Sequence, residues 1–140
     1  KGQPFNPAVR TWICPPTRMD QQQLKDEAYY STYSAVGARI EIAGCSLCMG
    51  NQARVPDKAN VFSTSTRNFD DRMGNGARVF LGSAELGAIS ANLGRLPTRE
   101  EYFKAYAEKI APKADKVYRY LQFDELAGYA PKGKKLRVVA

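Results

Sequence analysis

Short β-rich segments alternate with helical stretches and Gly-containing loops between residues 9 and 96, and this order restricts the fold class more than any other feature. Residues 38–43 alternate apolar and polar side chains with the period of a strand. The segment at residues 10–14 ends at two prolines, which cannot continue a strand ladder. Strand-like runs therefore stand at residues 10–14, 38–43, 60–65 and 78–82.

Helices are predicted after the first and the last of these strands. The first begins at Thr17 or Asp20 and extends to about Val36, with Gly37 as its stop. The second covers residues 84–92, with Ser83 as its N-cap and Gly94 after its end. This order of strands and helices is typical of an α/β domain, a layered sheet with flanking helices.

Composition sets the expected domain boundaries. Residues 1–8 contain two prolines and are expected to be a linker or a truncated end, and residues 9–96 form the α/β core. Residues 97–140 are expected to add helices and a basic tail to the same domain, because 140 residues hold one core. Thr98 and Glu101 form a capping box at the start of a helical pattern that Pro112 interrupts. A turn at residues 123–126 and a last strand at residues 136–139 complete the predicted elements.

Charge and residue usage exclude several function classes. The chain has 21 Lys and Arg against 14 Asp and Glu and no His, so a Ser-His-Asp hydrolase is excluded. The net charge of +7 suits anionic ligands or nucleic acid. A basic face that only contacts solvent is the other interpretation and is given twice the weight of a nucleic-acid site. No apolar run is long enough to span a membrane, and three cysteines do not make a secreted disulfide framework, so we expect a cytoplasmic chain without a membrane partner.

Cys45 and Cys48 form a Cys-x-x-Cys pair between Gly44 and Gly50, directly after the second predicted strand. Two thiolates at this spacing can face one metal ion or cluster, and a redox dithiol uses the same spacing. Packing as small apolar side chains is the third interpretation, and ligation is favoured over it. Cys14 lies in an apolar strand and is interpreted as a core residue. A complete zinc site within the chain is not expected, because two further ligands are missing.

Arg67 and Arg72 lie in a loop rich in Ser, Thr and Gly after the third predicted strand. Guanidinium groups bind carboxylates through two parallel hydrogen bonds, so two of them suit a polycarboxylate. The alternative, weighted equally on the residues alone, is that they pair at the surface with acidic neighbours, which are Asp57, Asp70 and Asp71.

Residues 38–54 and 63–72 together closely resemble the aconitase family, in particular its bacterial B-type branch. The resemblance extends through residues 12–17, 80–86 and 118–121 and so covers essentially the whole chain. Aconitases are far longer than 140 residues, so the resemblance implies a C-terminal piece that carries part of the cluster site.

The resemblance implies roles for individual residues. Cys45 and Cys48 would be two of three thiolates that hold a 4Fe-4S cluster, with the third upstream of this chain, and Cys14 is not among them. Arg67 and Arg72 match two family arginines that bind substrate carboxylates. Thr66 stands where many aconitases have Asn, and Asn51 is a candidate polar group near the cluster.

The implied reaction is the reversible isomerisation of citrate to isocitrate through cis-aconitate, with 2-methylisocitrate as a second candidate substrate. The cluster would act as a Lewis acid, the remaining catalytic groups would lie on other domains, and the isolated chain would be inactive. Two rival functions remain open: an apo module that binds mRNA through its basic charge, and a thiol redox module at Cys45 and Cys48.

Overall fold

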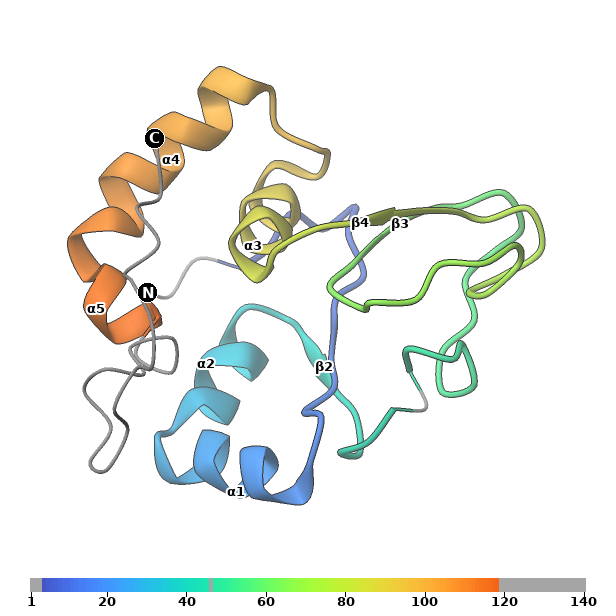
Figure 1. Cartoon of the computed structure of the whole chain (residues 1–140), viewed down its shortest axis with the longest axis horizontal. Helices are drawn as coiled ribbons and strands as arrows, with labels where there is room; N and C mark the ends of the chain where they lie inside the picture. Colours follow the sequence, from blue (N-terminus) through green and yellow to red (C-terminus); the bar gives the residue numbers. More distant parts are fainter. Residues whose placement is uncertain (1–3, 46, 119–140) are drawn as a thin grey trace, which may run out of the picture. The chain divides into compact units, whose positions relative to one another are not determined.

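The computed structural model describes residues 4–45 and 47–118 of the chain (Figure 1). One compact unit extends to Phe103, and a second begins at Lys104. The elements in chain order are β1 (Trp12–Ile13), α1 (Arg18–Asp26), α2 (Tyr29–Ala35), β2 (Arg39–Ile40), β3 (Asn60–Ser63), β4 (Arg78–Leu81), α3 (Ala84–Leu93), α4 (Arg99–Lys109), the 3-10 turn η1 (Ala111–Lys113) and α5 (Ala114–Val117).

The strands form two parallel pairs. β1 pairs with β2, with Trp12 opposite Arg39, and β3 pairs with β4 along its whole length. Helices α1 and α2 connect β1 to β2, which is the crossover that a parallel pair requires. The mixture of helices and parallel strands agrees with the α/β class. Over the described ranges, however, the strands make two separate pairs and not the single layered sheet that the sequence predicted.

The first helical stretch is broken, and the prediction of one continuous helix to Val36 was wrong. Thr17 caps α1 as expected, because its Oγ1 accepts a hydrogen bond from the Asp20 backbone at 3.2 Å. Ala28 then adopts a left-handed conformation with φ of 58°, which ends α1 and starts α2 in a new direction. Neither helix has a fully buried residue, but partial burial raises the pKa of Tyr33 in α2, with smaller contributions from Tyr29 and Tyr30. The two helices stay in contact across the break, since Nζ of Lys25 in α1 lies 5.7 Å from the centroid of the Tyr30 ring in α2.

Phe62 of β3 packs under the start of α3. A Cβ placed on Gly82 or Gly87 would meet the Phe62 ring at 2.7 and 2.9 Å, so the two glycines give the ring its space. Ser83 caps α3 by accepting a hydrogen bond from the Leu86 backbone at 3.3 Å, and Gly94 ends the helix with φ of 78°. Both caps confirm the sequence prediction. The buried hydrophobic residues around this region and the loops are Ala38, Ala53, Met73, Ile89 and Ala91.

Residues 1–8 were expected to be a linker or a truncated end, and the described part of this segment contacts two helices. The backbone N–H of Phe5 donates to the Val36 carbonyl at 3.1 Å, and that of Asn6 donates to the Ala91 carbonyl at 3.0 Å. The Asn6 side chain also lies against Gly94, where a Cβ would meet it at 2.7 Å. These contacts tie residues 5 and 6 to the ends of α2 and α3.

The capping box at the start of α4 forms as predicted. Thr98 donates its backbone N–H to Glu101 at 2.8 Å, and its Oγ1 accepts from the Glu101 backbone at 3.3 Å. Pro112 lies in η1, where the helical pattern is interrupted. The predicted turn at residues 123–126 and strand at residues 136–139 lie outside the described residues.

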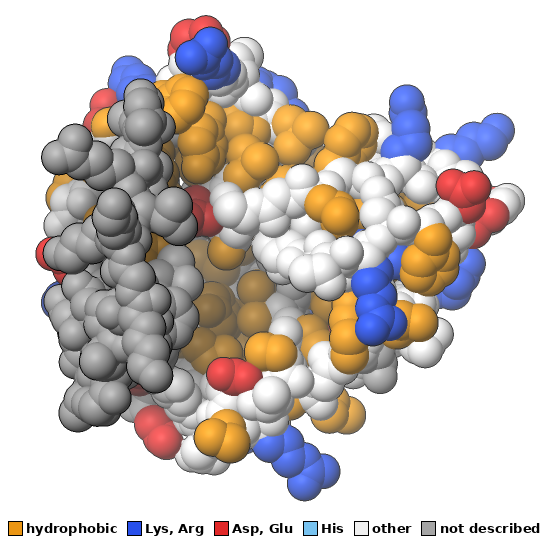
Figure 2. All heavy atoms as spheres, in the orientation of Figure 1, with side chains coloured by type: hydrophobic (Ala, Val, Ile, Leu, Met, Phe, Trp, Pro, Cys, Tyr) orange, Lys and Arg blue, Asp and Glu red, His pale blue; other side chains and the backbone are white. Residues whose placement is uncertain are grey.

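Large apolar side chains remain at the surface of the first unit. Figure 2 shows apolar side chains interspersed with basic and acidic ones over the visible face. Exposed examples are Met19, Ile42, Phe69, Phe80 and Leu81. None of the helices in the described part of the chain has the length and apolar character needed to cross a membrane.

Candidate metal and anion site

The Cys-x-x-Cys loop is the direct continuation of β2. Backbone hydrogen bonds from Glu41 to Ile13 at 2.8 Å and from Gly44 to Pro15 at 2.9 Å continue the β1–β2 pairing up to the first cysteine. The chain then turns, with the Met49 backbone N–H donating to the Cys45 carbonyl at 3.3 Å. The pairing therefore fixes where the loop starts.

The two cysteines of the loop lie together. Their Cα atoms are 5.4 Å apart, and their sulfur atoms are joined as a disulfide in this structure. Cys45 is exposed and Cys48 is half-buried. Both a chelating pair and a redox dithiol require sulfurs that can meet in this way, and chelation requires the reduced thiols.

Gly50 closes the loop against the arginine segment. It adopts a left-handed conformation with φ of 74°, and a Cβ at this position would collide with the backbone carbonyl of Arg72. Only glycine provides both the conformation and the space. The backbones of the cysteine loop and of the arginine loop are therefore in direct contact.

Arg72 is the most deeply buried charged residue of the site, with 2% of its surface exposed. Its Nη1 donates a hydrogen bond to the Cys48 carbonyl at 2.7 Å. Its Nε and Nη2 are buried and have no hydrogen-bond partner among the described residues. Burial lowers the pKa of this guanidinium below its ordinary value.

Arg67 reaches the same loop from the surface. Its backbone N–H donates to Ser65 Oγ at 3.2 Å, which orders the segment after β3. Its Nη1 lies 2.8 Å from the thioether sulfur of Met49, a weak acceptor that a carboxylate would readily replace. The structure thus brings both arginines to the consecutive residues Cys48 and Met49.

The surface pairing that the sequence left as an alternative is not found. Between residues 4 and 118, leaving out residue 46, neither Arg67 nor Arg72 forms an ion pair. Asp71 instead accepts a hydrogen bond from the Gly76 backbone at 2.6 Å, and Asp57 accepts one from the Asn75 side chain at 3.4 Å. Neither aspartate therefore neutralises the two guanidinium groups.

Other residues considered from the sequence occupy different positions. Cys14 is half-buried and contacts the base of the cysteine loop, so it is not the fully buried core residue that was expected. Asn51 and Thr66 are both exposed. Met49 and Gln52 were not singled out from the sequence, whereas Gly50 was named there as a flank of the cysteine pair. The glycine directly after Cys48-Met49 was the available signal for a close backbone approach.

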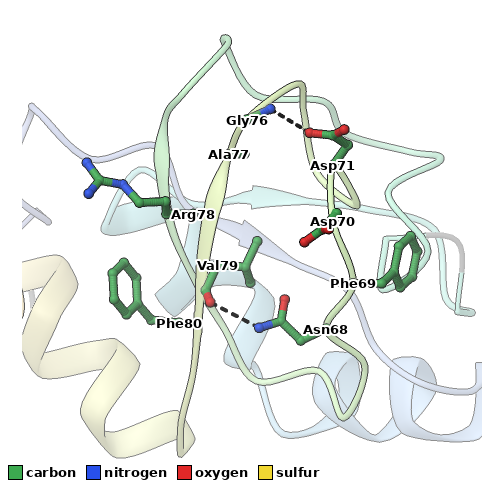
Figure 3. A pocket seen from close by; sticks show the side chains of 9 residues that line it. All are labelled: Asn68, Phe69, Asp70, Asp71, Gly76, Ala77, Arg78, Val79 and Phe80. Carbon is green, nitrogen blue, oxygen red and sulfur yellow. Dashed lines mark hydrogen bonds between the residues drawn. The ribbon is translucent and has the colours of Figure 1, made fainter.

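An open depression of about 650 Å³ lies beside the arginine loop (Figure 3). The side chain of Asn68 crosses it to donate to the Val79 carbonyl at 3.2 Å, and Asp71 reaches the Gly76 backbone at its other end. Neither arginine of the site and neither loop cysteine lines it. The depression is therefore lined by the segment between the two arginines and not by the arginines or the cysteines themselves.

The donor set fits an iron–sulfur cluster only in part. Cysteine thiolates are the usual ligands of such clusters, and Cys45 and Cys48 supply two. In the segments that the structure describes, no group of three or more Cys, Asp or Glu residues is placed to hold a metal ion. A complete cluster site needs at least one ligand from elsewhere.

Comparisons with known proteins identify the family. The model of the Aconitase family (aconitate hydratase) matches residues 1–94. Aconitate hydratase B of Synechocystis is 59% identical over 125 residues, which cover 89% of this chain and 14% of that protein. Aconitate hydratase B of Escherichia coli is 58% identical over 124 residues, with the same coverage. The large subunit of 3-isopropylmalate dehydratase from Flavobacterium johnsoniae is 33% identical over 104 residues, 74% of this chain and 22% of that subunit.

The resemblance seen in residues 38–54 and 63–72 is thus confirmed over most of the sequence. The chain spans only 14% of the length of the aconitate hydratase B relatives that it matches. On the family match and the identity to these relatives, the chain belongs to the aconitase family.

Proposed function

We propose that this chain is part of an aconitate hydratase, a hydro-lyase that interconverts citrate and isocitrate through cis-aconitate. Cys45 and Cys48 hold a 4Fe-4S cluster in this proposal, and Arg67 and Arg72 bind substrate carboxylates. The activity belongs to the longer protein, because the chain spans 14% of its relatives. A 2-methylisocitrate dehydration is a second candidate activity of the same site.

The observation that carries this proposal is the convergence of both guanidinium groups on Cys48 and Met49. A cluster held by Cys45 and Cys48 would therefore have two cations beside it. An acid with several carboxylates is the ligand whose charge matches such a site.

Arg72 also has a suitable free edge for a carboxylate. Nε and Nη2 of a guanidinium point to the same side and donate to both oxygens of one carboxylate. In Arg72 these two atoms lack an acceptor among the described residues, while Nη1 is held by Cys48. Because both atoms are shielded from solvent, a carboxylate reaches them only after the residues around them move.

In this proposal the residues of the chain and the cluster have different roles in the reaction. When bound, the cluster supplies a Lewis-acidic iron for the substrate hydroxyl. Arg67 and Arg72 orient the substrate through its carboxylates and neutralise their charge. Neutralisation makes the loss of a proton from the neighbouring carbon less costly, because negative charge develops on that carboxylate. The third thiolate and the remaining acid and base groups come from other parts of the longer protein.

The exposed apolar surface supports contact with those other parts. Phe69, between the two arginines, and Phe80 of β4 are 51% and 43% exposed and line the same depression. Large apolar side chains that remain at a surface commonly mark where further protein packs. We expect the isolated chain to be inactive, because it lacks both the protein that would pack on this surface and the third ligand of the cluster. A cytoplasmic location, where thiols stay reduced, is part of the same proposal.

The test uses the full-length protein that contains this chain. After anaerobic reconstitution with iron and sulfide, iron and acid-labile sulfide are measured per chain in wild type, Cys45→Ser and Cys48→Ser. We expect both variants to lose most of the cluster, while Arg18→Gln, a change at an exposed residue of α1, retains it. Equal cluster content in wild type and Cys45→Ser would remove Cys45 from the site.

A further inference from the structure

The sulfur of Cys14 lies at the base of the Cys-x-x-Cys loop. It is 3.2 Å from the Ile42 carbonyl oxygen and 3.3 Å from the Gly44 carbonyl oxygen, just before Cys45. It is also 3.8 Å from Oε1 of Gln52, on the opposite side of the loop. One thiol therefore contacts both ends of the segment that carries Cys45 and Cys48.

The backbone holds Cys14 in this position. Hydrogen bonds from Glu41 to Ile13 and from Gly44 to Pro15 lie on either side of it along the chain. Pro15, the next residue, is almost completely buried. The direction of the Cys14 side chain is therefore determined by paired backbone and not by a free loop.

The carbonyls of Ile42 and Gly44 have few other donors. Counting only residues that the structure describes, no backbone N–H donates to either of them. The contact with the Gly44 carbonyl is partly buried, where an oxygen is costly to leave without a donor, whereas the contact with the Ile42 carbonyl is exposed. The S–H group of Cys14, a weak donor, can serve either of the two carbonyls.

We infer that Cys14 is a positioning residue, whose thiol closes the base of the loop at residues 44–52 and so fixes Cys45 and Cys48 relative to β1. What the loop holds rests on the proposed function. The contacts with three oxygen atoms distinguish this role from packing of an apolar side chain. Cys14 itself is not a ligand in this inference, because its sulfur faces the backbone carbonyls of Ile42 and Gly44.

The experiment compares three variants of the full-length protein. Cys14→Ala removes the donor, Cys14→Ser keeps a donor of similar size, and Ile89→Val is a control that trims a buried residue of α3 away from the loop. Amide hydrogen exchange of residues 43–52 is measured in the cluster-free protein. The rate of iron release to a chelator is measured after reconstitution.

We expect exchange in residues 43–52 and iron release to be about threefold faster in Cys14→Ala, the effect of losing one weak hydrogen bond. Cys14→Ser should restore most of both rates, and Ile89→Val should leave both near wild type. Exchange in Cys14→Ala equal to wild type, or Cys14→Ser as fast as Cys14→Ala, would overturn the inference. Faster exchange with unchanged iron release would overturn the link to the cluster ligands.

The two readouts separate this inference from the proposed function. A wild-type protein that takes up no iron would overturn the proposed function and the link to cluster ligands with it. The exchange comparison in the cluster-free protein decides by itself whether Cys14 closes the loop.

Discussion

The guanidinium of Arg72 donates a hydrogen bond to the backbone carbonyl of Cys48 at 2.7 Å, although the two residues are 24 positions apart in the chain. The contact joins a buried cation to the loop that carries both cysteines of the pair. The guanidinium group and the two cysteines therefore lie close together in the fold. A substitution in either loop should affect the other loop.

Arg67→Gln should weaken substrate binding without changing the cluster. Among the described residues, the exposed guanidinium has one hydrogen-bond acceptor, the weak thioether sulfur of Met49, so its loss does little to the fold. A charged hydrogen bond to a carboxylate is worth about 1.5–3 kcal/mol, which is roughly a tenfold to hundredfold rise in the KM for citrate. Steady-state kinetics of the full-length enzyme, with Arg18→Gln as control, measures this KM. A KM within twofold of wild type would contradict the assignment of Arg67.

Arg72→Lys should affect both the substrate and the loop. Lysine keeps the charge but lacks the planar fork, so it cannot hold the Cys48 carbonyl and also bind a carboxylate through two hydrogen bonds. We expect a larger rise in KM than in Arg67→Gln, together with faster iron release, measured in parallel on the same preparations. Iron release at the wild-type rate would show that the bond to Cys48 does not hold the loop.

Gly50→Ala should destabilise the site more than Gly37→Ala does. Both glycines have positive φ, 74° and 81°, so each substitution introduces about 1–2 kcal/mol of backbone strain. Only at Gly50 would the added Cβ also collide with the Arg72 carbonyl, since Gly37 has no atom within 4 Å of that position. Urea unfolding and hydrogen exchange of residues 44–52 measure the difference. Equal effects of the two substitutions would contradict the close contact.

The start of α4 should lose stability at acid pH. Hydrogen bonds from the Arg95 side chain, and then from the Thr98 backbone, lower the pKa of Glu101 from 4.5 to about 2. A carboxyl with a lowered pKa stabilises the folded state above its unfolded pKa, and this contribution is lost as the pH falls from about 4.5 towards 2. An NMR titration of the Glu101 carboxyl carbon follows it directly. In Glu101→Gln the acid-dependent loss of helix at residues 99–103 should disappear.

Local signals in the sequence predicted the helix starts well, whereas β1 and β2 are shorter than the predicted strands at residues 10–14 and 38–43. The caps at Thr17, Ser83 and Thr98 form as expected, because a capping hydrogen bond depends on residues only two or three positions apart. The left-handed turn at Ala28 was missed, because alanine carries no sequence signal for that conformation. The pairing of strands into two separate sheets was missed as well, because it depends on contacts between distant segments.

The candidate residues were predictable from chemistry and resemblance, but their mutual contacts were not. Nothing local to Arg72 indicates that it is buried against Cys48, and the thiol of Cys14 reaches residues 28 and 30 positions away. Such contacts arise from the path of the whole chain. The ligand roles of Cys45, Cys48, Arg67 and Arg72 remain predictions that rest on this convergence.

A crystal structure of the full-length protein, reconstituted with iron and sulfide and soaked with citrate, tests the central claim most directly. The account predicts that the sulfurs of Cys45 and Cys48 bind iron of one cluster, and that citrate carboxylates contact Arg67 and Nε and Nη2 of Arg72. Iron bound away from these two cysteines, or citrate bound with both arginines in their present contacts, would contradict it.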